Sequence, residues 1–188
     1  FPIVNTETEF LYTKGFYSRV TDKMHGRVTR LFVTPLIRAL QEFAGEGNQY
    51  LKYMDSFRYI LAGEFAMDHE LVKRVRIPCD WGLEVGMLSE VFRNCSLKQI
   101  CEAEILSTYE HKHQALVASP RKGLNKMVVD ISKSIFSVLA SEGMDFRQET
   151  FDNLAVAYRR IAQDLIAEFY SDAAFNSIGY RRDEEQPT

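Results

Sequence analysis

The sequence predicts an α/β fold with a helical C-terminal extension, and three observations support this class. Strand-like stretches near residues 10–15, 57–67 and 101–111 alternate with segments of helical spacing. The last third carries two long apolar stripes with the period of a helix. The 188 residues are 46% hydrophobic and 26% charged, which is typical of a globular chain with a packed core.

Composition also excludes several classes of protein. A net charge of −3 gives no general attraction to nucleic acid or to an anionic membrane, and the short basic run at 73–76 is expected to be a solvated rim. The three cysteines contain no CxxC pair, which argues against a zinc site or a disulfide framework and favours a reducing, cytoplasmic setting. No apolar run approaches about 18 residues, so no membrane helix is expected. The first residues lack the features of a signal peptide and a Met, and we expect a longer chain.

The first half of the chain begins with an alternating stretch that predicts a strand ending near Gly15. Helical spacing starts at Val28 and is interrupted by Thr34-Pro35. Either the helix kinks there, or a new helix begins with Thr34 as N-cap and Pro35 in its first position. Residues 44–49 are expected to form a loop.

The middle of the chain is expected to hold two strands and two helices. Residues 57–67 resemble a buried strand that runs into a glycine turn. Asp68 is the predicted N-cap of a short helix within 67–77. Asp80 is expected to cap a second helix that continues to about Asn94. A strand with one partly buried face should follow at 101–111.

Two long helices are predicted in the last third, where we expect them to pack antiparallel as a structural cover. The first ends before Gly143. Its apolar positions are Leu124, Met127, Val128, Ile131, Ile135, Val138 and Leu139. Those of the second are Phe151, Leu154, Tyr158, Ile161, Leu165 and Phe169.

Glu84 is the most informative single position. In the helix from Asp80 it falls on the apolar stripe, and burying an ionised carboxylate is costly unless it is paired or hydrogen-bonded. Gly82 and Gly86 flank it, and each costs a helix about 1 kcal/mol relative to alanine. Either a ligand or another backbone approaches closely here, or Glu84 forms an internal salt bridge beside a close helix crossing.

Two further clusters have both a functional and a structural interpretation. Glu64 follows a glycine at a strand end, where it either belongs to a site or accepts hydrogen bonds from the amides of the turn. Gly26, Arg27 and Thr29 stand at the entry to a helix, where amides, a guanidinium and a hydroxyl suit a phosphate or carboxylate. The alternative is that Arg27 is a surface charge.

The paired histidines, His111 and His113, would share one face with Tyr109 if this segment is extended. Imidazole serves as a metal ligand or a general base, but two histidines at this spacing also fit the polar end of a strand. The sequence has no HExxH, GxSxG, Walker A or GxGxxG motif. A hydrolase that uses Glu64 and Glu84 as a carboxylate pair is a further alternative.

In order along the chain, "GRVTRLFVTPLIRAL", "LAGEFAM", "WGLEVGML" and "LSTYEHKHQAL" resemble the C-terminal half of glucosyl-3-phosphoglycerate synthases, over roughly residues 10–125. The resemblance implies a GT-A fold. It implies that 1–120 form the acceptor- and metal-binding half of a catalytic domain, and that 121–188 form a helical extension packed on it. It also implies transfer of glucose from a nucleotide sugar, UDP-glucose or GDP-glucose, to the 2-hydroxyl of 3-phosphoglycerate with retention.

The same resemblance assigns roles to residues. His111 would bind a divalent cation, Mg²⁺ or Mn²⁺, whose acidic partner would lie outside this sequence. The acceptor would be held by Gly26, Arg27, Thr29 and His113. The donor-sugar site would be lined by Leu61, Gly63, Glu64 and Trp81, and Glu84 would be the catalytic carboxylate.

Several alternatives stay open. A mannosyl donor, or glycerate as acceptor, fits because "YEHKH" departs from the family pattern at Tyr109 and His113. A non-catalytic oligomerisation or regulatory module is the competing class of function. A homodimer is expected, and the fragment alone is expected to be inactive.

Overall fold

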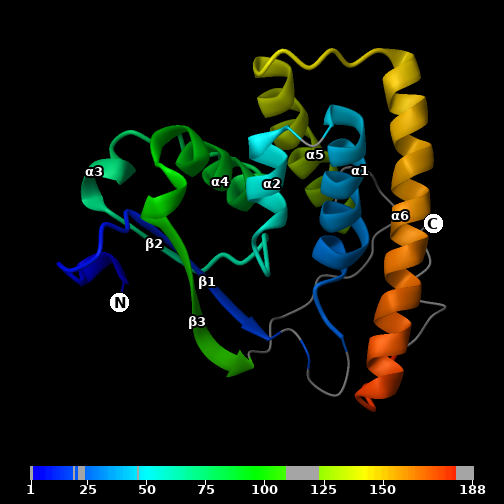
Figure 1. The fold of residues 1–188 in the computed structure, drawn as a ribbon, viewed down its shortest axis with the longest axis horizontal. Coiled ribbons are helices and arrows are strands. Elements are labelled where there is room, and N and C mark those ends of the chain that lie inside the picture. Colours follow the sequence, from blue (N-terminus) through cyan, green and yellow to red (C-terminus); the bar gives the residue numbers. More distant parts are fainter. Residues whose placement is uncertain (1, 19, 21–23, 46, 109–122, 181–188) are drawn as a thin grey trace. The chain divides into compact units, whose positions relative to one another are not determined.

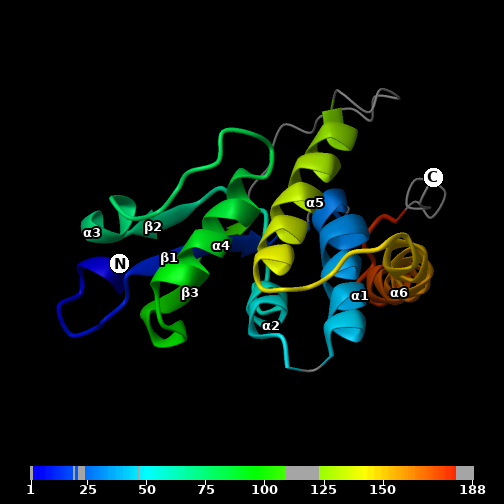
Figure 2. The same cartoon turned by 90° about the horizontal axis from the view of Figure 1, so that it is seen from above.

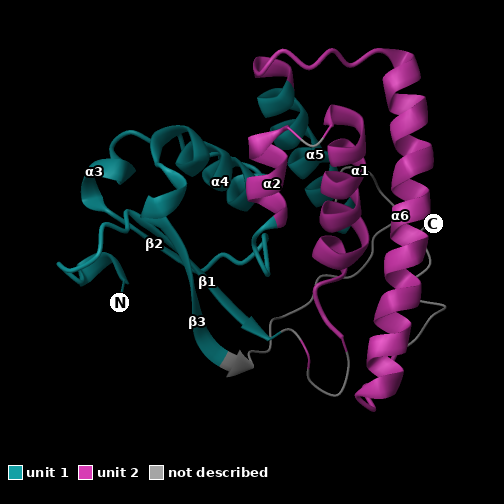
Figure 3. Ribbon diagram, in the orientation of Figure 1, with its two compact units in different colours: residues 1–18, 56–139 teal, residues 19–55, 140–188 magenta. Residues whose placement is uncertain are grey.

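The computed structural model describes residues 2–18, 20, 24–45, 47–108 and 123–180. Over these residues the fold is mixed α/β, with one small three-stranded sheet and six α-helices (Figure 1). The chain forms two compact units, each built from two separate stretches (Figure 3). Unit 1 is Phe1–Ser18 with Ser56–Leu139, and unit 2 is Arg19–Asp55 with Ala140–Thr188. The expected division at residue 120 stays a prediction.

Unit 1 holds the sheet, in the order β2-β1-β3. The central strand pairs antiparallel with β2 and parallel with β3, so that Lys14 lies opposite Phe65 on one side and Glu102 on the other. A short 3₁₀ turn precedes β3 and another lies near the N-terminus. The elements are β1 (Tyr12–Ser18), β2 (Phe65–Met67), β3 (Ile100–Thr108), η1 (Pro2–Val4) and η3 (Leu97–Gln99).

Three helices complete unit 1: α3 (His69–Val72), α4 (Leu83–Asn94) and nearly all of α5 (Gly123–Ser141). Their apolar faces supply much of the core, where a fully buried Leu, Ile or Val contributes roughly 1.5–3 kcal/mol. Buried members are Leu71, Val85, Met87, Leu88, Val91, Ile131, Ile135 and Leu139. The predicted cap is confirmed, since the Asp68 carboxylate accepts hydrogen bonds from the amides of Glu70 and Leu71.

Unit 2 is helical. Helices α1 and α6 lie side by side in both views (Figures 1 and 2), and Figure 1 shows that they run in opposite directions. The Tyr158 hydroxyl of α6 donates to the Leu31 carbonyl at 2.8 Å and joins them further. Within this unit α6 packs on α1, and its expected packing against α5 stays a prediction. The elements are η2 (Thr29–Val33), α1 (Thr34–Ala44), α2 (Gln49–Asp55) and α6 (Gln148–Phe175).

Proline at position 35 does not end the predicted helix. Helical backbone runs without a break from Arg27 to Ala44, and η2 is a π-helical turn in which the Thr34 amide donates to the Thr29 carbonyl. A proline offers no amide hydrogen, so widening the preceding turn lets the helix continue. The alternative with Thr34 as N-cap is wrong, because Thr34 is itself helical.

Two strand predictions are wrong in their limits. Gly15 lies inside β1, not at its end. The strand carries a glycine here because the backbone of Glu64 and the side chain of Ile105 approach so closely that a Cβ would lie 3.0 and 3.2 Å from them. The expected strand over 57–67 is confined to β2, and the buried residues before it form turns. The predicted strand at 101–111 is confirmed as far as Thr108. None of the described helices is long and apolar enough to cross a membrane.

Candidate functional site

The centre of the site in unit 1 is a lysine on the middle strand. Lys14 is only 1% exposed, and its ammonium group donates a hydrogen bond to the Ala62 carbonyl at 2.5 Å. Burying an ammonium group is costly unless hydrogen bonds and opposite charges replace its water. Lys14 occupies the face of β1 that also carries Tyr12 and Phe16, because alternate strand residues point the same way.

Three carboxylates surround this lysine. Burial lowers the pKa of Lys14 to about 8, while the negative charges of Glu84, Glu64 and Glu102 act in the opposite direction. Glu84 has the largest of these three effects, and its charge also adds to burial in raising the pKa of the Tyr12 phenol. The structure therefore brings the predicted residues Glu64 and Glu84 together around one buried cation.

Residues 61–64 are hydrogen-bonded to β1 through the two residues that flank Gly63, Ala62 and Glu64. Besides the Lys14 bond to Ala62, the Gly15 amide donates to the Glu64 carbonyl at 2.7 Å. The Tyr17 hydroxyl donates to the Glu64 carboxylate at 3.3 Å. Gly63 itself is exposed, and a Cβ built on it would meet no described atom within 4 Å. The turn thus has a fixed backbone with open space beside Gly63.

Of the other predicted donor residues, Leu61 is buried in the core of unit 1 and Trp81 is 42% exposed. Trp81 precedes α4, and its amide donates to the Asp130 carboxylate at 3.3 Å. A hydrogen bond from Lys126, followed by smaller effects, holds the pKa of Asp130 below its usual range. Helix α5 therefore anchors the backbone at Trp81, while the indole ring stays accessible.

Helix α4 begins two residues later than predicted, because its N-cap is Gly82 and not Asp80. It starts at Leu83, and the Asp80 carboxylate accepts a hydrogen bond from the Gly82 amide just before it. Glu84 lies in the first turn and is half-buried. A carboxylate in this position is favoured by the helix dipole.

The two glycines beside Glu84 are explained by the chain itself. A Cβ on Gly82 would lie 2.4 Å from the Ser134 hydroxyl and 2.9 Å from the Asp130 carbonyl. A Cβ on Gly86 would lie 2.4 Å from the ring of Pro78. Both interpretations left open by the sequence allow this close packing, so the glycines do not decide between a ligand and a salt bridge at Glu84.

In unit 2, the predicted acceptor residues stand where the helical segment before α1 begins. Gly26 adopts a positive φ of 75°, and its carbonyl accepts the first bond of the helix, from the Arg30 amide. The Thr29 side chain is 6% exposed, and its hydroxyl has no hydrogen-bond partner among the residues that the structure describes. A buried hydroxyl without a partner costs roughly 1–3 kcal/mol, so this position is destabilised unless a ligand or water satisfies it.

Arg27 is half-buried at the first helical position. Together with the amides of the first turn, it gives this end of the segment a positive potential. These are features that an anionic ligand would use, and the acceptor role of these residues stays a prediction.

The predicted metal ligand His111 and the predicted acceptor residue His113 lie outside the described residues. Within the part of the chain that is described, no three His, Cys, Asp or Glu side chains come together as a metal site. The assignment of His111 therefore stays a prediction.

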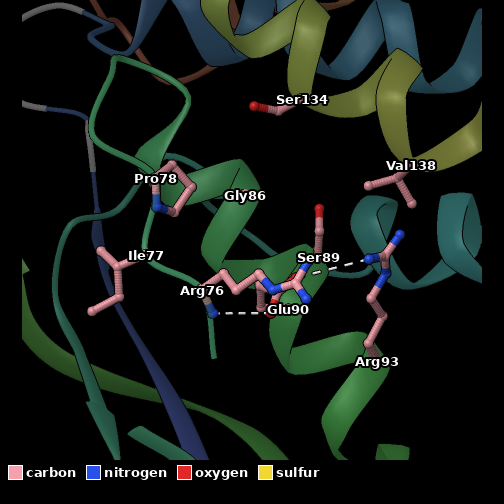
Figure 4. A pocket seen from close by; sticks show the side chains of 9 residues that line it. All are labelled: Arg76, Ile77, Pro78, Gly86, Ser89, Glu90, Arg93, Ser134 and Val138. Carbon is pink, nitrogen blue, oxygen red and sulfur yellow. Dashed lines mark hydrogen bonds and ion pairs between the residues drawn. The ribbon is translucent and has the colours of Figure 1, made fainter. Parts of the chain in front are cut away.

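Unit 1 also holds an open pocket of about 240 Å³ (Figure 4). Among the described residues its one carboxylate, Glu90, accepts a hydrogen bond from the backbone amide of Arg76 at 3.0 Å and lies 3.9 Å from the Arg93 guanidinium. No predicted donor or acceptor residue lines it. Its lining is Arg76, Ile77, Pro78, Gly86, Ser89, Glu90, Arg93, Ser134 and Val138.

Lys14 is the residue that the sequence analysis missed. The signal was present, since this lysine stands between Tyr12 and Phe16 on one face of an alternating strand. A charged residue inside such a stripe has to find partners in the fold.

Two curated proteins match nearly the whole chain, and both are named glucosyl-3-phosphoglycerate synthase. The one from Persephonella marina is 47% identical over 185 residues, which cover 98% of this chain and 46% of that protein. The one from Methanococcoides burtonii is 46% identical over 192 residues, which cover 99% of this chain and 46% of that protein. No family model matches the chain.

The resemblance to glucosyl-3-phosphoglycerate synthases is therefore confirmed, and it extends beyond residues 10–125 to nearly all of the sequence. The chain spans about half the length of the curated relatives that it matches. That share is consistent with the C-terminal half that the motifs indicated.

Proposed function

We propose that the protein containing this chain transfers a glucosyl group from a nucleotide sugar to the 2-hydroxyl of 3-phosphoglycerate with retention, and that this chain is the C-terminal portion of a GT-A fold. The observation that carries the proposal is the 46–47% identity, over nearly all of this chain, to two proteins named glucosyl-3-phosphoglycerate synthase. The arrangement in unit 1 supports it, because residues 61–64 and the start of α4 meet around Lys14.

On this proposal, unit 1 holds the sugar of the donor. The exposed backbone at Gly63 and the half-exposed Trp81 ring would face the sugar, with Leu61 behind them. Glu84 and Glu64 would accept hydrogen bonds from its hydroxyl groups. The positive charge that develops on the sugar during transfer is stabilised by a nearby carboxylate, and Glu84 is the residue to which we assign that role.

Gly26, Arg27 and Thr29 would hold the acceptor. A fork of guanidinium donors and the helix amides suit its carboxylate or phosphate, and the buried Thr29 hydroxyl would gain the partner that it lacks among the described residues. His113 would complete this set.

A divalent cation, Mg²⁺ or Mn²⁺, belongs to the proposal, with His111 as the ligand from this chain. When bound, it would neutralise charge on the leaving nucleotide diphosphate. In the full-length protein, His111→Ala should lower activity strongly and weaken the dependence on Mn²⁺. Unchanged Mn²⁺ activation would remove His111 from this role.

The experiment that tests the function is a screen of UDP- and GDP-sugars against 3-phosphoglycerate and glycerate, with the full-length protein. Formation of glucosyl-3-phosphoglycerate with the anomeric configuration of the donor is the expected result. A mannosyl product, or a product from glycerate alone, would replace the substrate assignment. Release of free glucose as the main product would favour the hydrolase, and no turnover and no binding of 3-phosphoglycerate would favour a non-catalytic module.

A homodimer in the cytoplasm remains part of the proposal. Light scattering during size-exclusion chromatography measures the mass in solution. A monomeric mass at micromolar concentration would contradict the dimer.

A further inference from the structure

Lys14 connects three parts of unit 1 that the proposed function needs together: β1, residues 61–64 and the first turn of α4. Building on the proposed function, we propose that Lys14 is a positioning residue for the donor sugar: its ammonium group fixes the Ala62 carbonyl and holds the carboxylates of Glu64 and Glu84 in the arrangement that receives the sugar. It acts through these groups, not by touching the reacting atoms.

The hydrogen bond to Ala62 sets the backbone of the turn. Ala62 is fully buried, and the next residue, Gly63, is exposed with open space beside it. Since Ala62 and Gly63 are adjacent, the direction of the Ala62 carbonyl determines the plane of the peptide that leads into Gly63. One bond from the sheet therefore controls the part of the turn that would face a sugar.

The charge of Lys14 controls the carboxylates. Glu64, Glu84 and Glu102 all act on it, and the positive charge of the ammonium group offsets part of the mutual repulsion of these three negative charges. Without that charge the carboxylates would favour positions further apart, so Lys14 supports their arrangement around the sugar.

Stability alone does not explain a lysine here. The position is buried between two strands, where an apolar side chain of similar length would avoid the cost of desolvating an ammonium group. The Lys14 ammonium group instead donates to the Ala62 carbonyl, and the charges of the two predicted donor-site carboxylates act on it. This placement argues for a role in function.

The test compares Lys14→Met with Lys52→Met in the full-length protein, because Lys52 is exposed on α2 and serves as the matched control. We expect Lys14→Met to lower kcat by about 100-fold, as expected for a loosened active site, with the acceptor KM changed less than about threefold. The alkaline limb of its pH profile should be lost, because that limb in the wild type follows deprotonation of Lys14, whose pKa burial lowers to about 8. Lys52→Met should leave all three quantities unchanged.

A folded Lys14→Met protein that keeps the alkaline limb of the wild type would overturn the proposal, since a purely structural role would lower activity without changing the pH profile. If Lys14→Met does not fold, Glu102→Gln decides. Glu102 is the register partner of Lys14 and raises its pKa, so its removal should move the alkaline limb to lower pH. An alkaline limb identical to that of the wild type would then exclude Lys14.

The two proposals fail in different ways. An inactive wild-type protein in the sugar screen refutes the proposed function. If the wild type is active and neither substitution changes the pH profile of activity, only the role of Lys14 is refuted.

Discussion

The starts of two helical segments, one in each unit, show the same sequence signal for different reasons. At the start of α4, Gly82 and Gly86 flank a carboxylate, and before α1, Gly26 precedes an arginine and a threonine. In the first region the space at both glycines is filled by Pro78, Ser134 and the backbone of Asp130. In the second, the Thr29 hydroxyl is buried, and no described residue satisfies it.

The difference teaches that a glycine beside a charged group is not by itself evidence for a ligand. In unit 1 the buried ammonium group of Lys14 is stabilised by the Ala62 carbonyl and by nearby carboxylates, so substitutions there should change stability as well as activity. In unit 2 the Thr29 hydroxyl has no described partner and is available to a ligand, so substitutions should change ligand binding with little cost in stability. Each prediction below tests one side of this contrast.

The largest effect is expected from the pH dependence of stability at Lys14. Folding lowers its pKa from 10.5 to about 8, so the unfolded chain binds more protons between these values. Stability contributed at this site therefore rises with pH through this window. Relative to Lys14→Met, the wild type should gain about 2 kcal/mol in the free energy of unfolding between pH 7.5 and 9.5.

Urea unfolding of both proteins across this pH range measures the difference. Comparison with the variant cancels other groups that titrate nearby, such as Tyr12 and Cys95, whose raised pKa values act in the opposite direction. Parallel curves for the two proteins would show that Lys14 is not a buried ammonium group.

Arg27→Ala tests the ligand-facing side of the contrast. Loss of a charge-assisted hydrogen bond costs about 1.5–3 kcal/mol, so the acceptor KM should rise roughly 10- to 100-fold. The donor KM and the thermal stability should change little. Steady-state kinetics with each substrate varied in turn provides the measurement, and equal effects on both KM values would move Arg27 out of the acceptor site.

Gly86→Ala tests the side on which the chain fills the space. The new methyl group would lie 2.4 Å from the ring of Pro78, and overpacking of this kind costs roughly 1–3 kcal/mol. The better helix propensity of alanine returns up to about 1 kcal/mol, which leaves a net loss of about 1 kcal/mol. Gly47→Ala is the control, because a Cβ there meets no described atom within 4 Å. A stabilised Gly86→Ala protein would mean that Pro78 is free to move.

Local features of the fold could be predicted from the sequence, and long-range ones could not. The cap at Asp68 and the helix end at Asn94 depend on neighbours a few residues away, and both are confirmed. The extension of β1 past Gly15 depends on Glu64 and Ile105, which are distant in sequence. Burial of residues 60–62 was predicted, but a buried turn and a buried strand share the same hydrophobic pattern.

The candidate site was predictable to the same degree. Motifs identified Glu64, Glu84 and Thr29, but not the lysine that joins the first two, because pairing of β1 with β3 and the fold of residues 61–64 decide its partners. Predictions at His111 and His113 lie outside the described residues and are unchanged.

The smallest effect, and the sharpest test of the contrast, is expected from Thr29→Val. Valine has nearly the shape of threonine and removes a buried hydroxyl that no described residue satisfies, so the free energy of unfolding should stay unchanged or rise by up to about 1 kcal/mol. If that hydroxyl binds the acceptor, the acceptor KM should nevertheless rise by about three- to tenfold, since a net hydrogen bond is worth about 0.5–1.5 kcal/mol. Thr29→Ser, which keeps the hydroxyl, should preserve the KM and lose some stability through the missing methyl group. Urea unfolding combined with acceptor kinetics separates the two effects. A destabilised Thr29→Val protein with a normal acceptor KM would show that the hydroxyl has a structural partner, and the two regions would then be alike.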